Sequence, residues 1–127
     1  MPGPGPRRRV DPRRRLGNAG EDAVARWYEA AAYEVVDRNW RCRDGELDLV
    51  VHRDAMLVFC EVKTRASTRF GAPVEAVTGT KQRRLRMLAA RWLAEHDAHR
   101  RNLRFDVASV TRSPGGELVV EVLEGAF

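Results

Sequence analysis

The alternation of apolar and polar positions predicts two amphipathic helices. In the first, over residues 16–32, apolar side chains recur every three or four positions. The second begins at about Thr80 and repeats this spacing. Its apolar stripe consists of Leu85, Leu88, Ala89, Trp92 and Leu93.

Five further segments are rich in β-branched and aromatic residues, which predicts strands. They cover residues 33–40, 46–52, 56–63, 103–110 and 118–123. Residues 46–63 resemble a hairpin with its turn at 53–55, and the last two strands form a second hairpin. A strand, helix and strand in succession usually close as a parallel crossover. We therefore expect an α/β fold, with a mixed five-stranded sheet flanked by helices in the order helix, three strands, helix, two strands.

The length of 127 residues, of which 43% are hydrophobic, fits one compact domain. Residues 1–15 are rich in Arg and Pro and cannot build a core, so we predict a disordered tail followed by a single domain over residues 16–127. The sequence has no apolar run long enough to span a membrane, and its beginning lacks the apolar segment of a secretory signal. These features predict a cytoplasmic protein without a membrane partner.

The charge is unevenly distributed. The tail holds six arginines and one aspartate, which accounts for the whole net charge of +5. In the remainder, residues 81–104 carry eight basic groups against two acidic ones, whereas residues 16–63 carry ten acidic groups against six basic ones. A basic face beside an acidic cleft suits a metal-using enzyme that acts on phosphodiesters, and so predicts a nucleic-acid partner.

Acidic side chains concentrate on the two arms of the first predicted hairpin. Strand alternation should place Glu46 and Asp48 on one face, with Leu47 on the other, and should put Glu61 on the same face as Lys63. Pairing of the arms can bring these charges onto one surface. Close carboxylates repel unless a cation or a proton relieves them. An E-x-K pattern alone is more often a surface ion pair, but with "GELD" on the neighbouring arm a metal site is favoured.

Mg²⁺, or Mn²⁺ in its place, is the expected cation, since Mg²⁺ prefers oxygen ligands and usually takes one or two carboxylates. We predict Asp48 and Glu61 as its ligands, with the backbone carbonyl of Val62 as a third. Lys63 could position or deprotonate a water molecule, or stabilise developing negative charge. The residues leave these roles open.

Other polar residues are candidates for the same site. Glu21 could reach it, although an acid in a first helical turn is also explained by the helix dipole. Gln82 lies at the entrance of the second helix, either half-exposed or aimed at the site. Residues 65–79 form a long polar loop, and such loops are often functional. The predicted contacts to nucleic-acid phosphates are Arg65, Arg69, Lys81, Arg83 and Arg84, with simple solvation as the alternative.

Four stretches resemble, in order and spacing, the YraN-like family of small bacterial proteins. They are "AGEDAVARWYEAAAYEVVDRNWRCRDGELDLVV", "VFCEVKTR", "FGAPVEAVTGTKQRRLRMLAARWL" and "RFDVASV", within residues 17–112. That family is similar to the PD-(D/E)xK nucleases, close to the Holliday-junction resolvases. The chain departs from the family pattern at Cys60, where valine is usual, and at Ala32, where glycine often turns the chain.

The resemblance implies a restriction-endonuclease-like core and a role for each candidate. Asp48 and Glu61 become metal ligands and Lys63 the catalytic lysine, while Glu21 becomes the first-helix acid and Gln82 an accessory glutamine.

Three functions follow in order of preference. The first is a Mg²⁺-dependent endonuclease acting on DNA, with branched or resolvase-type DNA as candidate substrates. The alternative is a nucleic-acid-binding module with a nuclease-like fold and no cleavage. The third is a protein-interaction domain with an incidental carboxylate cluster. A homodimer is a further expectation, because two symmetric cuts need two sites related by a two-fold axis.

Overall fold

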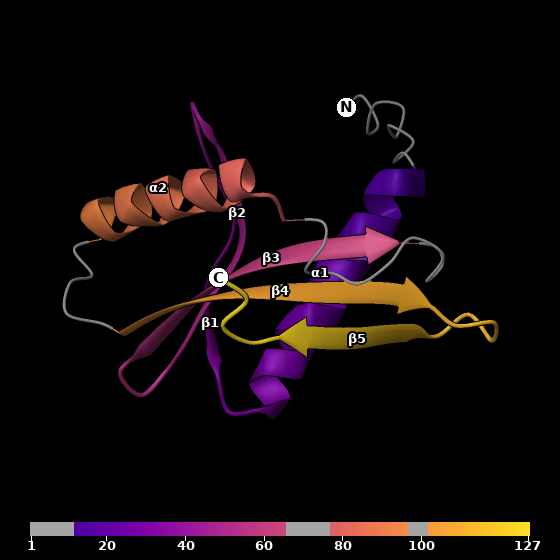
Figure 1. Ribbon diagram of the computed structural model, residues 1–127. Helices are drawn as coiled ribbons and strands as arrows, with labels where there is room; N and C mark the ends of the chain where they lie inside the picture. Colours follow the sequence, from indigo (N-terminus) through magenta and orange to yellow (C-terminus); the bar gives the residue numbers. More distant parts are fainter. Residues whose placement is uncertain (1–11, 66–76, 97–101) are drawn as a thin grey trace, which may run out of the picture.

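The computed structural model describes residues 12–65, 77–96 and 102–127, with the side chains of the first helix described from Gly17 onward. Two helices and five strands occur in the predicted order (Figure 1). They are α1 (Pro12–Ala30), β1 (Glu34–Cys42), β2 (Gly45–Arg53), β3 (Met56–Arg65), α2 (Gly79–Glu95), β4 (Asn102–Arg112) and β5 (Leu118–Leu123).

The five strands form one mixed sheet in the order β1-β2-β3-β4-β5. β3 and β4 are parallel and are connected through α2, whereas every other neighbouring pair is antiparallel. The two helices cover opposite faces of this sheet (Figure 1). The predicted fold class is therefore confirmed.

Strand alternation divides the apolar core between these faces. On β3, Leu57 and Phe59 pack toward α2, while Val58 and Cys60 pack toward α1. The α2 core also contains Leu85, Leu88, Ala89, Trp92, Phe105 and Val107, and the α1 core also contains Val24, Ala25, Tyr28, Ala108 and Val110. The predicted apolar stripe of the second helix is thus buried, except that Leu93 is only partly covered.

The first helix begins at Pro12, four residues before the predicted start. Proline suits a first helical turn because its fixed φ is helical and its missing N–H has no partner there. The helix ends at Ala30, and the chain then turns at a left-handed residue, Ala32, with φ 68°. The Tyr33 amide then donates to the Tyr28 carbonyl at 2.9 Å, which closes the helix end. Residues 1–11 of the predicted tail lie outside the described residues.

The β2–β3 turn is tighter than predicted, with only Asp54 and Ala55 between the strands. Asp54 adopts φ 52°, the left-handed conformation that two-residue hairpin turns need and that aspartate tolerates. The helix α2 is capped by Thr78, whose Oγ1 accepts the Lys81 amide at 3.2 Å. In the described part of the chain, neither helix has the length and apolarity to cross a membrane.

Candidate active site

The site lies where β2 and β3 separate. Their pairing runs from the turn to Leu49 opposite Cys60 and does not continue beyond it. The next β3 amide, that of Val62, donates to the Oδ2 atom of Asp48 at 2.9 Å. The Asp48 side chain therefore takes a hydrogen bond that a neighbouring strand would otherwise accept. This contact places the Asp48 carboxylate beside β3, next to Glu61.

The predicted alternation along β2 is wrong at this point. Leu47 packs in the α2 core and Leu49 in the α1 core, although residues two apart on a regular strand share a face. On the partner strand β1, Asn39 lies between the residues paired with these two leucines and adopts φ 52°. The strands are thus irregular around Asp48.

Glu61 holds both lysines of the site through one oxygen. Its Oε1 atom lies 3.2 Å from Lys63 Nζ and 2.9 Å from Lys81 Nζ. The Glu61 side chain is only 10% exposed, against 26% for Lys63 and 32% for Lys81. Lys63 comes from the same strand, whereas Lys81 comes from the first turn of α2. The carboxylate is therefore held from two separate elements.

A cavity of about 220 Å³ opens between the sheet and α2 at this point. Its acidic side is formed by Glu46, Asp48 and Glu61, and its basic side by Lys81 and Arg84. The remaining lining residues are Gly45, Leu85 and Leu88. The acidic wall and the basic wall thus face one small space, as the segregated charges of the sequence predicted.

Burial and crowding perturb the charges in this cavity. Burial, together with the charge of Glu61, raises the pKa of Asp48 to about 7, although its hydrogen bond from Val62 acts in the opposite direction. Burial and the neighbouring Lys81 lower the pKa of Lys63. Burial also disfavours the charge of Lys81, but its contacts with Glu61 and Lys63 outweigh this and raise its pKa. A further positive charge would thus relieve the carboxylates.

The donor set fits a hard divalent cation with few protein ligands. Across residues 12–65, 77–96 and 102–127, no three His, Cys, Asp or Glu side chains are grouped closely enough to hold a metal. Two carboxylates do adjoin, those of Asp48 and Glu61. Mg²⁺ commonly takes only one or two carboxylates and keeps several waters. The N–H group of Val62 donates the hydrogen bond to Asp48. The carbonyl group of Val62 remains a predicted metal ligand.

Glu21 approaches the site from α1. Its charge contributes to the raised pKa of Asp48, and burial raises its own pKa. Its Oε2 atom is buried and accepts no hydrogen bond from any described residue. Glu21 also lines a more open hollow of about 520 Å³, which shares Glu46 with the first cavity. The structure therefore brings Glu21 to the acidic side of the site.

α1 reaches β3 closely because of a glycine. A Cβ atom placed on Gly20 would collide with the Thr64 side chain on β3. Gly20 directly precedes Glu21, so this contact sets how near Glu21 comes to the sheet.

Gln82 has a local role in the structure. Its Nε2 atom donates to the Val77 carbonyl at 3.3 Å, just before α2 begins. It is not among the side chains that line the cavity, whereas its neighbour Lys81 is. The structure thus brings Lys81, which we predicted only as a phosphate contact, into the place where we expected Gln82.

The other predicted phosphate contacts are dispersed. Arg84 lines the cavity, while Arg83 is exposed and donates to Thr80 Oγ1 at 3.3 Å. Arg65 is half-buried at the end of β3. Arg69 lies outside the described residues.

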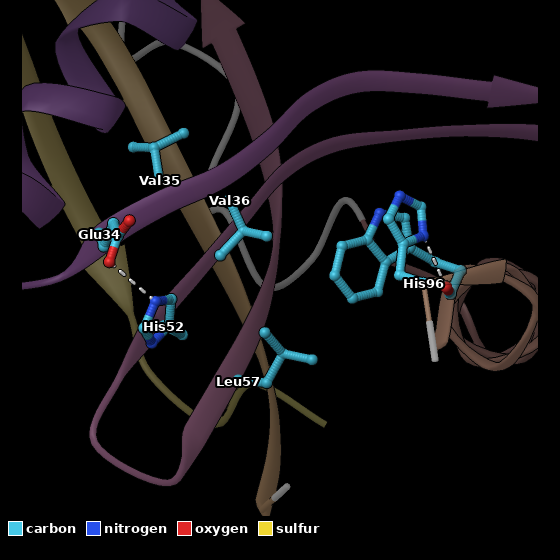
Figure 2. Close-up of a pocket in the computed structure, with 7 residues that line it drawn as sticks. Glu34, Val35, Val36, His52, Leu57 and His96 are labelled. Carbon is cyan, nitrogen blue, oxygen red and sulfur yellow. Dashed lines mark hydrogen bonds and ion pairs between the residues drawn. The ribbon is translucent and has the colours of Figure 1, made fainter. Parts of the chain in front are cut away.

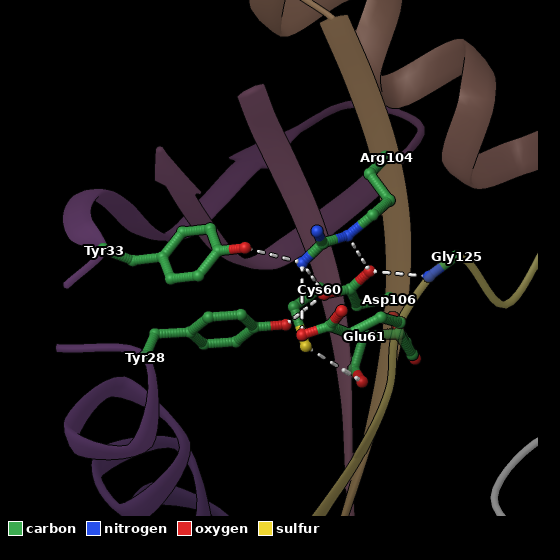
Figure 3. A network of polar contacts seen from close by, with 8 residues as sticks. Tyr28, Tyr33, Cys60, Glu61, Arg104, Asp106 and Gly125 are labelled. Carbon is green, nitrogen blue, oxygen red and sulfur yellow. Dashed lines mark hydrogen bonds and ion pairs between the residues drawn. The ribbon is translucent and has the colours of Figure 1, made fainter. Parts of the chain in front are cut away.

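A buried polar network supports β3 from the α1 face (Figure 3). The fully buried Asp106 accepts from Tyr28 Oη at 2.6 Å, from Arg104 Nε at 2.8 Å and from the Gly125 amide at 3.0 Å. Asp106 on β4 pairs with Cys60, the residue before Glu61. The network thus fixes β4 against the strand that carries the site, and its polar atoms are satisfied.

A separate hollow of about 380 Å³ lies at the other end of α2 (Figure 2). Each of its two histidines makes a hydrogen bond through one ring nitrogen, while the buried Nδ1 atom of His52 has no partner among the described residues. His52 Nε2 lies 3.0 Å from Glu34 Oε2, and His96 Nδ1 donates to the Trp92 carbonyl at 2.8 Å. The lining is completed by Val35, Val36 and Leu57. None of these residues belongs to the carboxylate site.

Known proteins of similar sequence cover nearly the whole chain. A family model described as "Uncharacterised protein family UPF0102" matches residues 20–110. A UPF0102 protein of Beutenbergia cavernae is 59% identical over 110 residues, which cover 87% of this chain and 93% of that protein. A UPF0102 protein of Frankia alni is 56% identical over 112 residues, covering 88% and 93%. One from Symbiobacterium thermophilum is 46% identical over 114 residues, covering 90% and 97%.

Proposed function

The chain belongs to the uncharacterised protein family UPF0102, the YraN-like family that its motifs resemble, and we propose that it is a divalent-metal-dependent endonuclease acting on DNA. In one cavity, the acidic side would bind a divalent cation and the basic side would bind a phosphate of the DNA. Branched or resolvase-type DNA is the candidate substrate, as the family resemblance implies. The homodimer and the cytoplasmic location stay predictions.

One observation carries this proposal: the hydrogen bond from the Val62 amide to Asp48 Oδ2, at 2.9 Å. It brings a carboxylate from the divergent part of β2 next to Glu61 on β3. Two adjoining, largely buried carboxylates raise the free energy of the metal-free protein unless a positive charge compensates them. A structural ion pair between Glu61 and Lys63 would not require Asp48 at this place.

Asp48 and Glu61 would hold the cation, and Glu21 would add negative charge from α1. When bound, such a cation activates a water molecule and balances the charge of a phosphodiester that is being displaced. The hydrogen bond from Val62 goes to the Oδ2 atom of Asp48, so its second carboxylate oxygen, Oδ1, would serve as the ligand.

The basic residues supply the substrate side of the site. Lys63 Nζ, on the same strand as Glu61, would lie beside the reacting phosphate and stabilise its developing negative charge. Arg84 would bind a flanking phosphate from α2, since it lines the same cavity. The buried side chains of Leu85 and Leu88 form the apolar part of the cavity lining.

The test is a cleavage assay on the full chain with Mg²⁺ or Mn²⁺. Labelled duplex, single-stranded, flap and four-way DNA are each incubated with the wild type and with Glu61→Gln and Lys63→Ala variants. Both substitutions should reduce cleavage by at least about 100-fold, in line with the loss of one charge-stabilising group. Glu121→Gln, the same change at an exposed β5 residue, should leave the rate unchanged. Absence of wild-type cleavage on every substrate with both metals would contradict the proposal.

The alternative is a nucleic-acid-binding module that does not cleave. It is favoured by one observation, that two ammonium groups already neutralise Glu61 without a metal. Under this alternative DNA binding falls steeply with salt, and Glu61→Gln changes it little. DNA affinity measured in EDTA and in Ca²⁺ separates the two functions, because only the metal site makes affinity depend on the divalent cation.

A further inference from the structure

The two lysines at Glu61 are the only lysines in the chain. Arginine occupies the other 21 of its 23 Lys and Arg positions. Lys63 and Lys81 are 18 positions apart and belong to different elements, yet both ammonium groups contact the same Oε1 atom. Elsewhere in the chain a positive charge is supplied by arginine, so this site favours lysine specifically.

Lysine and arginine differ in ways that matter in this space. An ammonium group is a compact point charge on a flexible stem, whereas a guanidinium is a broad, rigid fork. Two ammonium groups share the Oε1 atom of Glu61, and both Glu61 and Lys81 line the cavity of about 220 Å³. Arg84, one helical turn from Lys81, already supplies a guanidinium to the same cavity. Lys81 therefore adds a small, movable charge to it.

Lys81 also forms an ion pair with Glu61, the carboxylate that would bind the cation. Its Nζ atom lies 2.9 Å from Glu61 Oε1, closer than Lys63 at 3.2 Å. A divalent cation bound to the same carboxylate would be repelled by an ammonium group at that distance. Lys63 is fixed to the strand of Glu61, but Lys81 reaches it from the exposed first turn of α2. Lys81 is thus the group that can move away.

We propose that Lys81 is a positioning residue that holds the Glu61 carboxylate in the metal-free protein and turns to a phosphate of the nucleic acid when a cation binds. This inference rests on the proposed metal site. It makes metal binding and nucleic-acid binding depend on each other through one side chain. Without metal, Glu61 retains the ammonium group; with metal, the ammonium group becomes available to a phosphate beside Arg84.

The first measurement is the Mn²⁺ dependence of the thermal midpoint, which needs no cleavage. Lys81→Met keeps the aliphatic stem and removes the competing charge, so Mn²⁺ should bind about tenfold more tightly than to the wild type. Lys81→Arg retains a positive charge and should leave the Mn²⁺ affinity within about twofold of the wild type. Arg83→Met, the same change on the exposed side of α2, should likewise leave it unchanged.

The second measurement is the affinity for duplex DNA in EDTA and in Ca²⁺. Lys81→Met should weaken binding less than about twofold in EDTA, because Glu61 holds the ammonium group there, but about fivefold to tenfold in Ca²⁺. Arg83→Met should reduce affinity by the same factor in both buffers. A merely structural Lys81 would produce the same loss with and without metal.

The outcomes separate this inference from the function on which it rests. If the wild type binds Mn²⁺ but Lys81→Met binds it no more tightly, the inference is wrong and the proposed metal site stands. Equal loss of DNA affinity in EDTA and Ca²⁺ would overturn it in the same way. If Mn²⁺ does not raise the wild-type midpoint at any concentration, the proposed function fails and the inference with it.

Discussion

Replacing Asp48 with asparagine is expected to stabilise the metal-free protein at neutral and alkaline pH. Asparagine is nearly isosteric, and its Oδ1 atom can accept the Val62 amide hydrogen bond that Asp48 accepts at 2.9 Å. It removes the charge that is disfavoured by burial and by Glu61, which together raise the pKa of Asp48 to about 7. The folded protein binds this proton more tightly than the unfolded chain does. The contribution of Asp48 to stability is therefore fully present below about pH 4 and is lost as the pH rises through 7.

The size of the effect follows from the pKa. A rise from 3.8 to about 7 corresponds to a ceiling of about 4 kcal/mol, at about 1.36 kcal/mol per pH unit. Because the cavity is open to water, its effective dielectric constant is well above that of a dry interior, and we expect about half of this value. The free energy of unfolding of Asp48→Asn should thus exceed that of the wild type by about 2 kcal/mol at pH 8. At pH 4 the difference should fall below about 0.5 kcal/mol.

Urea unfolding in EDTA at pH 4, 6 and 8 measures this difference directly. Comparing the two proteins at each pH cancels the titration of the other groups that both contain. Asp44→Asn is the control, since Asp44 is exposed and its ion pair with Arg91 should contribute less than about 1 kcal/mol at every pH. Added Mn²⁺ should stabilise the wild type and not Asp48→Asn. A difference that is equal at pH 4 and pH 8, or a variant less stable than the wild type at pH 8, would refute the reasoning.

Three further substitutions test the framework around the site, each by urea unfolding at pH 7. Asp106→Ala should destabilise the protein by about 3–5 kcal/mol, because the half-buried Arg104 guanidinium loses its two hydrogen bonds to the Asp106 carboxylate. A loss below about 1 kcal/mol would contradict this. Gly20→Ala should lower the free energy of unfolding by about 1–3 kcal/mol, because the added methyl group collides with the Thr64 side chain. Adding Thr64→Ala to this variant should recover part of the loss. If the destabilisations by the two substitutions are strictly additive, the two side chains do not contact each other. Ala32→Gly should stabilise the protein by about 0.5–1 kcal/mol, since it relieves a left-handed alanine; destabilisation would argue against that conformation.

Two lysines contact the same oxygen of Glu61, and the sequence motifs predicted only one of these contacts, that of Lys63. An E-x-K pair explains Lys63, since the two side chains lie on one face of one strand. Lys81 comes from a helix eighteen positions later, and the sequence gives no spacing rule that links it to Glu61. The scarcity of lysine in an arginine-rich chain was a signal that could have directed attention to it.

Local patterns were sufficient for the elements and their order. Helical periodicity located the buried stripe of α2, and β-branched runs located all five strands, because these patterns reflect side-chain directions that a single element imposes. The parallel β3–β4 pairing also followed from the strand, helix and strand order. The helix start at Pro12 was missed because proline was taken as a helix breaker, although it is tolerated in the first turn.

The sequence by itself determined the fold class, and it singled out Asp48, Glu61 and Lys63 as candidates for one site. Only the tertiary structure decided how they meet. The departure of Asp48 from regular pairing, the salt bridge from Lys81 to Glu61 and the local hydrogen bond of Gln82 each depend on contacts between elements. Periodicity describes one element at a time, and such contacts depend on how a helix end and two diverging strands are packed together.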